Sequence, residues 1–214
     1  MTDGTPNLRE LNKRRTRQAI SHAATRLFIE QGFDRTTIAE VATAAGVAKM
    51  TVTNHFPRKE DLVLDLHAEL VAGLARTVTD RSPGESALAA LRRECLAALD
   101  RHDPSLGFAG ADFARTVTDS PALVARLREI HEQSEDALGA ALAEATDSPP
   151  ADLTARLAAG LLAAIHRTLF TDVFRRGLAG EDHATTARAI RPAAVRAFDQ
   201  LESALGGYAV RPSP

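Results

Sequence analysis

The sequence lacks several features that define other classes of protein. It has one cysteine, Cys95, among 214 residues, which excludes an internal disulfide framework and any zinc site built from several cysteines. Tryptophan is absent and aromatic residues make up only 4%, which disfavours a pocket for stacking large planar cations. No apolar run approaches the ~20 residues that cross a bilayer, and the polar N-terminus has no signal-peptide pattern. We therefore expect a cytoplasmic protein with no membrane partner.

The motifs of common enzyme classes are also missing. The sequence contains no Gly-x-Ser-x-Gly elbow, phosphate-cradling glycine loop, dinucleotide fingerprint or His-Glu-x-x-His motif. His131 and Glu135 share one helix face, but a charged and solvated face explains this pair better than a metal site does. We expect no catalytic residues, no metal and no cofactor.

Charge is distributed unevenly along the chain. Residues 1–60 hold ten Lys and Arg against six Asp and Glu, whereas residues 61–214 hold sixteen against twenty-two. A basic segment in a chain whose net charge is only −2 suggests a polyanionic partner. The alternative is chance combined with an arginine-rich composition.

The whole chain is predicted to be helical. Alanine and leucine dominate, and Pro and Gly stand between the periodic segments rather than inside them. After a disordered polar arm over 1–12, we expect helices over 13–31, 37–45 and 48–56, then a long helix that opens at 58–61 and is broken at 82–84. Further helices are expected over 85–101, 106–117, 121–146, 151–177 and 183–206. Pro192 should kink the last of these or displace its start.

Residues 37–56 have the layout of a helix-turn-helix. Two short apolar-periodic segments meet at Gly46, which can take the positive φ of a tight turn. Val52 and Phe56 hold the second segment against the first, and its polar side chains are left facing outward. Such side chains suit the DNA major groove. The predicted DNA-binding residues on this segment are Lys49, Met50, Thr51, Thr53, Asn54 and His55.

Two further residues stand where phosphate is commonly bound. Thr37 begins one helix and Lys59 begins another, and helix N-termini present free N–H groups to anions. Taken singly, Thr37 is equally well explained as an N-cap and Lys59 as a solvated charge.

At these residues the chain resembles the tetracycline-repressor (TetR) family of bacterial transcriptional regulators. The resemblance covers about 13–62 and is carried by Arg17-Gln18-Ala19-Ile20 through Leu27-Phe28, Gly32-Phe33, Thr37 to Ala42, Ala45-Gly46-Val47 and Asn54 to Leu62. It implies that Thr37, His55 and Lys59 contact phosphates. The position two before His55 is often aromatic in the family but is Thr53 here, which puts one contact to the DNA backbone in doubt.

The last two predicted helices carry more apolar surface than a helix needs when only one of its sides packs on the protein core. Leu161, Ile165 and Leu169 form a stripe on the first of them, and Phe198, Leu201 and Leu205 form one on the second. Pairing about a two-fold axis would cover both stripes in a four-helix interface, and the resemblance implies the same. The alternative is a monomer in which the final helix pair is internal.

Polar residues within apolar stripes mark a candidate ligand chamber between about 62 and 180. His131 and His166 interrupt two such stripes, and Asp112 shares a short helix with aromatic neighbours. We expect Phe108, Asp112, His131, His166 and Phe170 to line a pocket for a small, partly apolar molecule. The alternative is that each histidine is a core or dimer-interface residue whose hydrogen bond is satisfied within the protein.

These observations predict an all-α protein with three parts: the arm 1–12, a DNA-binding domain 13–60 and a ligand-binding and dimerisation domain 61–210. The favoured function is a homodimeric repressor that a small-molecule effector releases from a near-palindromic double-stranded DNA operator. A transcriptional activator, or an architectural DNA-binding protein without ligand sensing, remains open.

Overall fold

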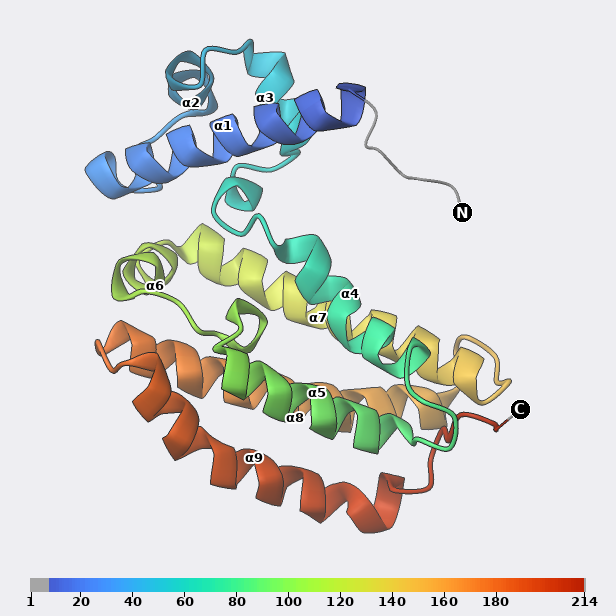
Figure 1. Cartoon of the computed structure of the whole chain (residues 1–214). Coiled ribbons are helices and arrows are strands. Elements are labelled where there is room, and N and C mark those ends of the chain that lie inside the picture. The colour runs from blue at the N-terminus through green and yellow to red at the C-terminus, as the bar shows by residue number, and fades with distance from the viewer. Residues whose placement is uncertain (1–7, 214) are drawn as a thin grey trace. The chain divides into compact units, whose positions relative to one another are not determined.

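The computed structural model describes residues 8–213, which are helical apart from turns and connecting loops (Figure 1). No strand occurs within this range, and the all-α prediction is confirmed. The chain divides into two compact units. One contains the described part of Met1–Asp65 together with Thr116–Val124, and the other contains Leu66–Arg115 and the chain from Ala125 onward.

The first unit is built from α1 (Leu8–Gln31), α2 (Ile38–Ala44), α3 (Lys49–His55) and the 3-10 helix η1 (Glu60–Leu62). Its apolar core is formed by one face of each helix. The largest fully buried side chains of this unit are Ile20, Val41, Val52, Phe56, Leu62 and Leu123. Helix α1 packs on α2, and α2 packs on α3.

The predicted disordered arm is wrong for residues 8–12, which form the first turns of α1. Leu8, Arg9, Glu10 and Leu11 are all good helix formers, and nothing between them and Lys13 breaks a helix. The prediction for residues 1–7 lies outside the described residues.

The long helix expected from 58–61 onward is interrupted. After η1 the chain passes through a turn, and α4 (His67–Thr79) begins only at His67. Asp65 is held by α1, because Arg17 Nη2 donates to its carbonyl at 3.3 Å and the Ser21 hydroxyl donates to its carboxylate at 3.2 Å. These bonds come from side chains more than forty residues away, so local periodicity does not reveal them.

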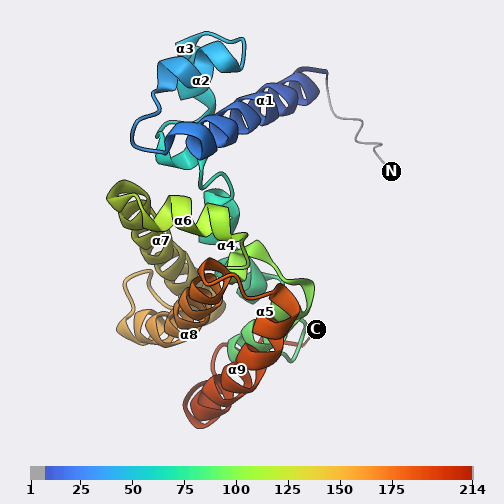
Figure 2. The same cartoon turned by 90° about the vertical axis from the view of Figure 1, so that its left-hand side faces the viewer.

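The second unit consists of packed helices with one continuous apolar core. It contains α4, α5 (Ala87–Arg101), η2 (Pro104–Leu106), most of α6 (Ala111–Thr118) and of α7 (Pro121–Ala145), α8 (Leu153–Leu178) and α9 (His183–Leu205). Helix α9 packs along both α5 and α8, and α4 packs on α5 (Figure 2).

Two local expectations in this unit are corrected. The helix expected over 106–117 begins at Ala111, because Gly107 takes a φ of +94° and ends η2 at Leu106. Pro192 lies inside α9 and does not displace its start, which is His183.

Helix α8 alone, within residues 8–213, is long and apolar enough to cross a membrane by length and composition. It supplies Ala159, Leu162, Leu169, Phe170 and Val173 to the buried residues of the second unit. Packing within the chain therefore accounts for part of the apolar character of α8, while Leu153, Leu157 and Leu161 of the same helix are exposed.

Candidate functional site

The turn between α2 and α3 follows from local sequence. Thr37 is the N-cap of α2: its hydroxyl oxygen accepts from the Glu40 N–H, while the Glu40 carboxylate accepts from the Thr37 N–H at 2.7 Å. This reciprocal pair is a capping box. Gly46 turns the chain with a φ of +67°, as predicted. Val52 is fully buried and fixes which side of α3 faces away from the core.

Helix α3 is also held at its C-terminal end by α1. Arg17 Nη1 donates to the His55 carbonyl at 2.7 Å, and its guanidinium carbon lies 4.1 Å from the centre of the Phe56 ring. The guanidinium thus satisfies a carbonyl that the end of the helix leaves free and packs on a buried aromatic ring.

The outward face of α3 carries the side chains expected to meet DNA. Lys49, Met50 and Asn54 are exposed, with 70% of Met50 accessible. Thr51 is partly buried. The Thr53 hydroxyl donates back to the Met50 carbonyl at 3.1 Å, so this side chain is folded along its own helix.

The three candidate phosphate ligands differ in how free they are. The Thr37 hydroxyl donates to the Glu40 carboxylate at 2.8 Å, in addition to its capping role. Lys59 Nζ lies 4.3 Å from the centre of the Phe33 ring and donates to the Asp34 carbonyl at 3.4 Å. Both residues are therefore held in defined positions within the first unit.

The third candidate, His55, is partly buried. Burial lowers the pKa of its imidazole, and the nearby charges of Arg17 and Lys13 lower it further. Its imidazole is therefore neutral at pH 7 in the free protein.

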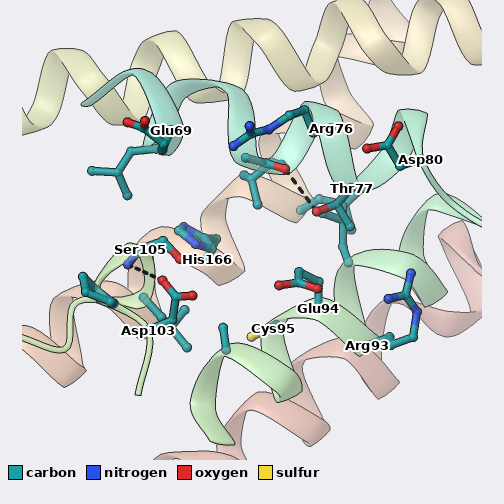
Figure 3. Close-up of a pocket in the computed structure, with 18 of the residues that line it drawn as sticks. Glu69, Arg76, Thr77, Asp80, Arg93, Glu94, Cys95, Asp103, Ser105 and His166 are labelled. Atoms are coloured by element: carbon teal, nitrogen blue, oxygen red, sulfur yellow. Dashed lines mark hydrogen bonds between the residues drawn. The ribbon is translucent and has the colours of Figure 1, made fainter. Parts of the chain in front are cut away.

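The second unit contains a cavity of about 700 Å³, drawn in Figure 3. Its walls come from α4, α5, η2, α8 and α9, and much of the lining is aliphatic. The principal apolar residues are Leu70, Leu74, Leu91, Leu106, Leu162 and Phe198. A volume of this size lies within the ~300–1,000 Å³ range of small-molecule sites.

Polar side chains line the cavity on several sides, including Glu69 and Asp80 as well as Glu94 (Figure 3). His166 of α8 lies beside Asp103 and Ser105 of the α5–η2 segment (Figure 3). Burial lowers the pKa of His166 to about 4, with nearby His131 adding to the effect and Asp103 opposing it. Cys95 also lines the cavity, but burial raises the pKa of its thiol to about 12, so the thiol is protonated and unreactive at pH 7.

Of the five predicted ligand-binding residues, the described cavity is lined by His166 alone. Phe108 and Phe170 are buried: Phe108 packs against the rings of His102 and His183, and Phe170 packs against those of His131 and Phe174. Asp112 is exposed and pairs with Arg115 at 2.6 Å. His131 does not line the cavity but is close enough to His166 to influence its pKa.

Sequence reasoning missed the wall formed by α4. The leucines at 66, 70 and 74 recur every four residues, but none of them was among the predicted ligand-binding residues. Leu66 is 47% exposed, and the other two are only partly buried. Gly73 on the same face lines the cavity as well. Within residues 8–213, no group of three or more His, Cys, Asp or Glu side chains is placed to hold a metal ion.

The predicted dimer residues fall into two groups. Leu169, Phe198 and Leu205 are buried within the chain's own core, which already covers them. Ile165 and Leu201 are partly buried, and Leu161 is 48% exposed. The apolar surface left on α8 instead includes Leu153 and Leu157, which are 64% and 61% exposed and continue the Leu161 stripe at four-residue spacing.

Comparison with known proteins identifies the first unit. The sequence model for bacterial regulatory proteins of the tetR family matches residues 20–66, which include the whole of α2, the turn and α3. The chain is also 31% identical over 147 residues to the HTH-type transcriptional regulator TcmR of Streptomyces glaucescens, covering 66% of this chain and 65% of TcmR. The chain belongs to the tetR family of bacterial regulatory proteins. The resemblance seen in residues 13–62 is therefore confirmed.

Other tetR-family relatives extend the comparison. The HTH-type transcriptional repressor AcnR of Corynebacterium diphtheriae is 34% identical over 94 residues, covering 44% of this chain and 46% of AcnR. The chain thus spans less than two thirds of the length of either TcmR or AcnR.

Solved structures match over most of the chain. NalD of Pseudomonas aeruginosa, the secondary repressor of the MexAB-OprM multidrug efflux pump, aligns with a TM-score of 0.53 at 22% identity, covering 87% of this chain and 96% of NalD. SmeT in its triclosan complex also aligns with a TM-score of 0.53, at 20% identity, covering 93% of this chain and 96% of SmeT. At these identities the likeness establishes the fold.

Proposed function

We propose that the protein is a cytoplasmic, homodimeric repressor that binds a near-palindromic DNA operator through α3 and is released from it by a small molecule. The observation that carries the proposal is α3 itself. Its inner side is fixed by the buried Val52 and by Arg17, while Lys49, Met50 and Asn54 project from a rigid support. A helix held in this way can enter the major groove without losing its own packing.

Each outward residue has a distinct role in this proposal. Asn54 can donate to and accept from a base edge, Met50 can contact a thymine methyl group, and Lys49 can reach guanine or phosphate. Lys59 and the neutral His55 supply contacts to the DNA phosphate backbone. For Thr37 to contact a phosphate, its hydroxyl would have to leave the Glu40 carboxylate, so its main role is to cap α2.

The exposed stripe of Leu153, Leu157 and Leu161 supports a two-fold interface centred on α8. Three leucines at four-residue spacing on one solvent-facing side of a helix are costly unless a partner covers them. Leu157→Glu should convert the protein to a monomer in sedimentation analysis, whereas Ala140→Glu, on the exposed side of α7, should not. A Leu157→Glu protein that remains dimeric would refute this interface.

Ligand release is proposed to act through α4. This helix directly follows Asp65, where the first unit ends, and its Leu70, Gly73 and Leu74 line the cavity. A molecule that fits one position of α4 better than another would shift the protein between states with different DNA affinity. The cavity residues therefore control binding at a distance from α3.

The proposal is tested by a gel shift with the DNA upstream of the protein's own gene, at two salt concentrations. Lys49→Ala should weaken binding and reduce the slope of log affinity against log salt by about one if Lys49 contacts a phosphate. Asn54→Ala should reduce discrimination between sequences, and Arg26→Ala on the exposed side of α1 should change neither. Binding that is unaffected by Lys49→Ala and Asn54→Ala would contradict the role of α3.

An activator with the same DNA-binding unit is the alternative. Placing the bound site upstream of a reporter promoter, and then across it, distinguishes the two functions, because a repressor acts by covering the promoter. Expression that rises when the protein is present would favour activation.

A further inference from the structure

We propose that the cavity of the second unit binds a protonated amine with an aliphatic body, an alkylammonium ion. Its N–H groups would donate to His166 and to the carboxylate of Asp103. This inference rests on the proposed ligand-responsive function and specifies its ligand class. Three properties of the cavity carry it: a set of aliphatic side chains in its wall, an excess of carboxylates and a partly buried imidazole without a hydrogen-bond partner.

The wall of the cavity favours an aliphatic ligand. Leucine side chains from α4, α5, η2 and α8 form most of its apolar surface, and Phe198 is the aromatic residue in the described lining. Leucine side chains offer dispersion contacts on all sides but no flat face on which a planar ring system could stack. A flexible alkyl chain suits this lining better than a polycyclic aromatic molecule.

The charged groups favour a cation over an anion. Four carboxylates line the cavity, from Glu69, Asp80, Glu94 and Asp103, against the guanidinium groups of Arg76 and Arg93. Arg93 is already bound in a two-point contact to Glu85, with Nε to Oε1 at 2.9 Å and Nη2 to Oε2 at 3.3 Å. Arg76 is then the guanidinium of the described lining that remains to meet an anionic ligand, against four carboxylates.

The carboxylates at the His166 end are only partly neutralised. Glu94 and Asp103 share a single nitrogen of Arg101, at 2.7 Å and 3.2 Å. Two negative charges therefore face one positive charge, and Arg101 is itself about half exposed. A second cation can bind here without displacing Arg101.

His166 distinguishes an amine from other cations. It lies within the protein facing the cavity, and no described residue forms a hydrogen bond with it. Burial keeps it neutral at pH 7, so its ring has one nitrogen that donates and one that accepts. An ammonium group has several N–H donors and can serve both this acceptor and Asp103, whereas a quaternary ammonium has none.

Asp103 is suited to be the counter-ion. Although burial alone would raise the pKa of its carboxyl group, the hydrogen bonds from Ser105 and Arg101 hold the pKa below its usual range. The carboxylate is therefore ionised at pH 7 and lies beside His166 (Figure 3). The two groups together offer an ammonium ion a hydrogen-bond acceptor and a negative charge.

The test compares four probes of one chain length by calorimetry with the full chain at neutral pH: octylammonium, octyltrimethylammonium, 1-octanol and octanoate. Octylammonium should bind most tightly, octyltrimethylammonium about tenfold more weakly because it lacks N–H donors, and octanoate weakest of all. Octanoate or 1-octanol binding as tightly as octylammonium would overturn the proposal.

Variants separate the two polar partners. His166→Leu should weaken the binding of octylammonium about tenfold and leave the affinity for octyltrimethylammonium unchanged. Asp103→Asn keeps the oxygen that accepts from the Ser105 N–H at 2.9 Å but removes the negative charge. It should therefore weaken the binding of both cations. Asp100→Asn removes a carboxylate on α5 outside the cavity and should weaken neither. Folded variants, checked by circular dichroism, with unchanged octylammonium affinity would also overturn the assignment.

A parallel measurement of DNA release keeps the two proposals apart. Octylammonium that binds with this pattern but leaves the operator complex intact would support the ligand class and contradict ligand-triggered release. Octanoate or 1-octanol that both binds more tightly and releases DNA would support the regulatory function and refute the amine.

Discussion

Replacement of Arg17 tests how firmly the recognition helix is supported. Its guanidinium donates to the His55 carbonyl at 2.7 Å and stacks 4.1 Å from the Phe56 ring centre. A hydrogen bond to a charged group contributes ~1.5–3 kcal/mol and an exposed cation–π contact ~0.5–1 kcal/mol. Because Arg17 is only partly buried, we take about 2 kcal/mol for both, which corresponds to about 30-fold in an equilibrium constant.

Arg17→Met retains the apolar stem and removes both interactions with the end of α3, as well as the 3.3 Å hydrogen bond to the Asp65 carbonyl, which lies outside α3. Hydrogen exchange of the α3 amides, followed by mass spectrometry of peptides covering 49–56, should therefore accelerate by about 30-fold, since local opening of α3 becomes easier by that factor. The exchange rate of Arg17→Lys should lie between those of the unaltered protein and Arg17→Met, because an ammonium group cannot reproduce the forked geometry of the guanidinium. Arg26→Met, on the exposed side of α1, is the matched control. Exchange in Arg17→Met within about twofold of the unaltered protein would refute this role.

Three further predictions concern the second unit. The pKa values of His131 and His166 are both lowered to about 4. Between this value and the ordinary value of about 6.5, the unfolded chain binds protons that the folded chain does not. The free energy of unfolding should therefore fall as pH drops from about 6.5 towards 4. Urea denaturation at several pH values should show this slope, and replacing both histidines by leucine should flatten it. Gly107→Ala should destabilise the protein by more than about 2 kcal/mol in denaturant titrations, because φ is +94° and the added Cβ would lie 2.5 Å from a backbone oxygen. Gly110→Ala, which has open space around it, should not. Arg81→Met should cost ~1–3 kcal/mol in the same titrations, since the buried guanidinium binds two backbone carbonyls; an unchanged midpoint would refute that contribution.

The DNA-binding unit could be predicted from sequence because its signals are local. Thr37 and Glu40 have the spacing of a capping box, Gly46 supplies the positive φ of the turn between α2 and α3, and Val52 and Phe56 define the inner face of α3. Each of these features depends on residues within a few positions of one another. They specify the helix-turn-helix without knowledge of the rest of the chain.

The cavity could not be predicted in the same way, because it depends on long-range packing. Phe108 and Phe170 looked like pocket residues by type, but Gly107 lets the chain approach the Phe170 backbone closely and both rings are buried. The four-residue spacing of Leu66, Leu70 and Leu74 predicts that they share one helix face, but not that this face lines a cavity. Apolar periodicity shows which face of a helix is covered, but not whether protein or ligand covers it.

The proposed function requires that two copies of α3 read two half-sites. In vitro selection from a pool of random DNA duplexes with the full chain measures this requirement. We expect enrichment of a near-palindrome whose half-sites are separated by about one helical turn or a multiple of it. Recovery of no common sequence, or of a single half-site without its symmetric partner, would contradict it.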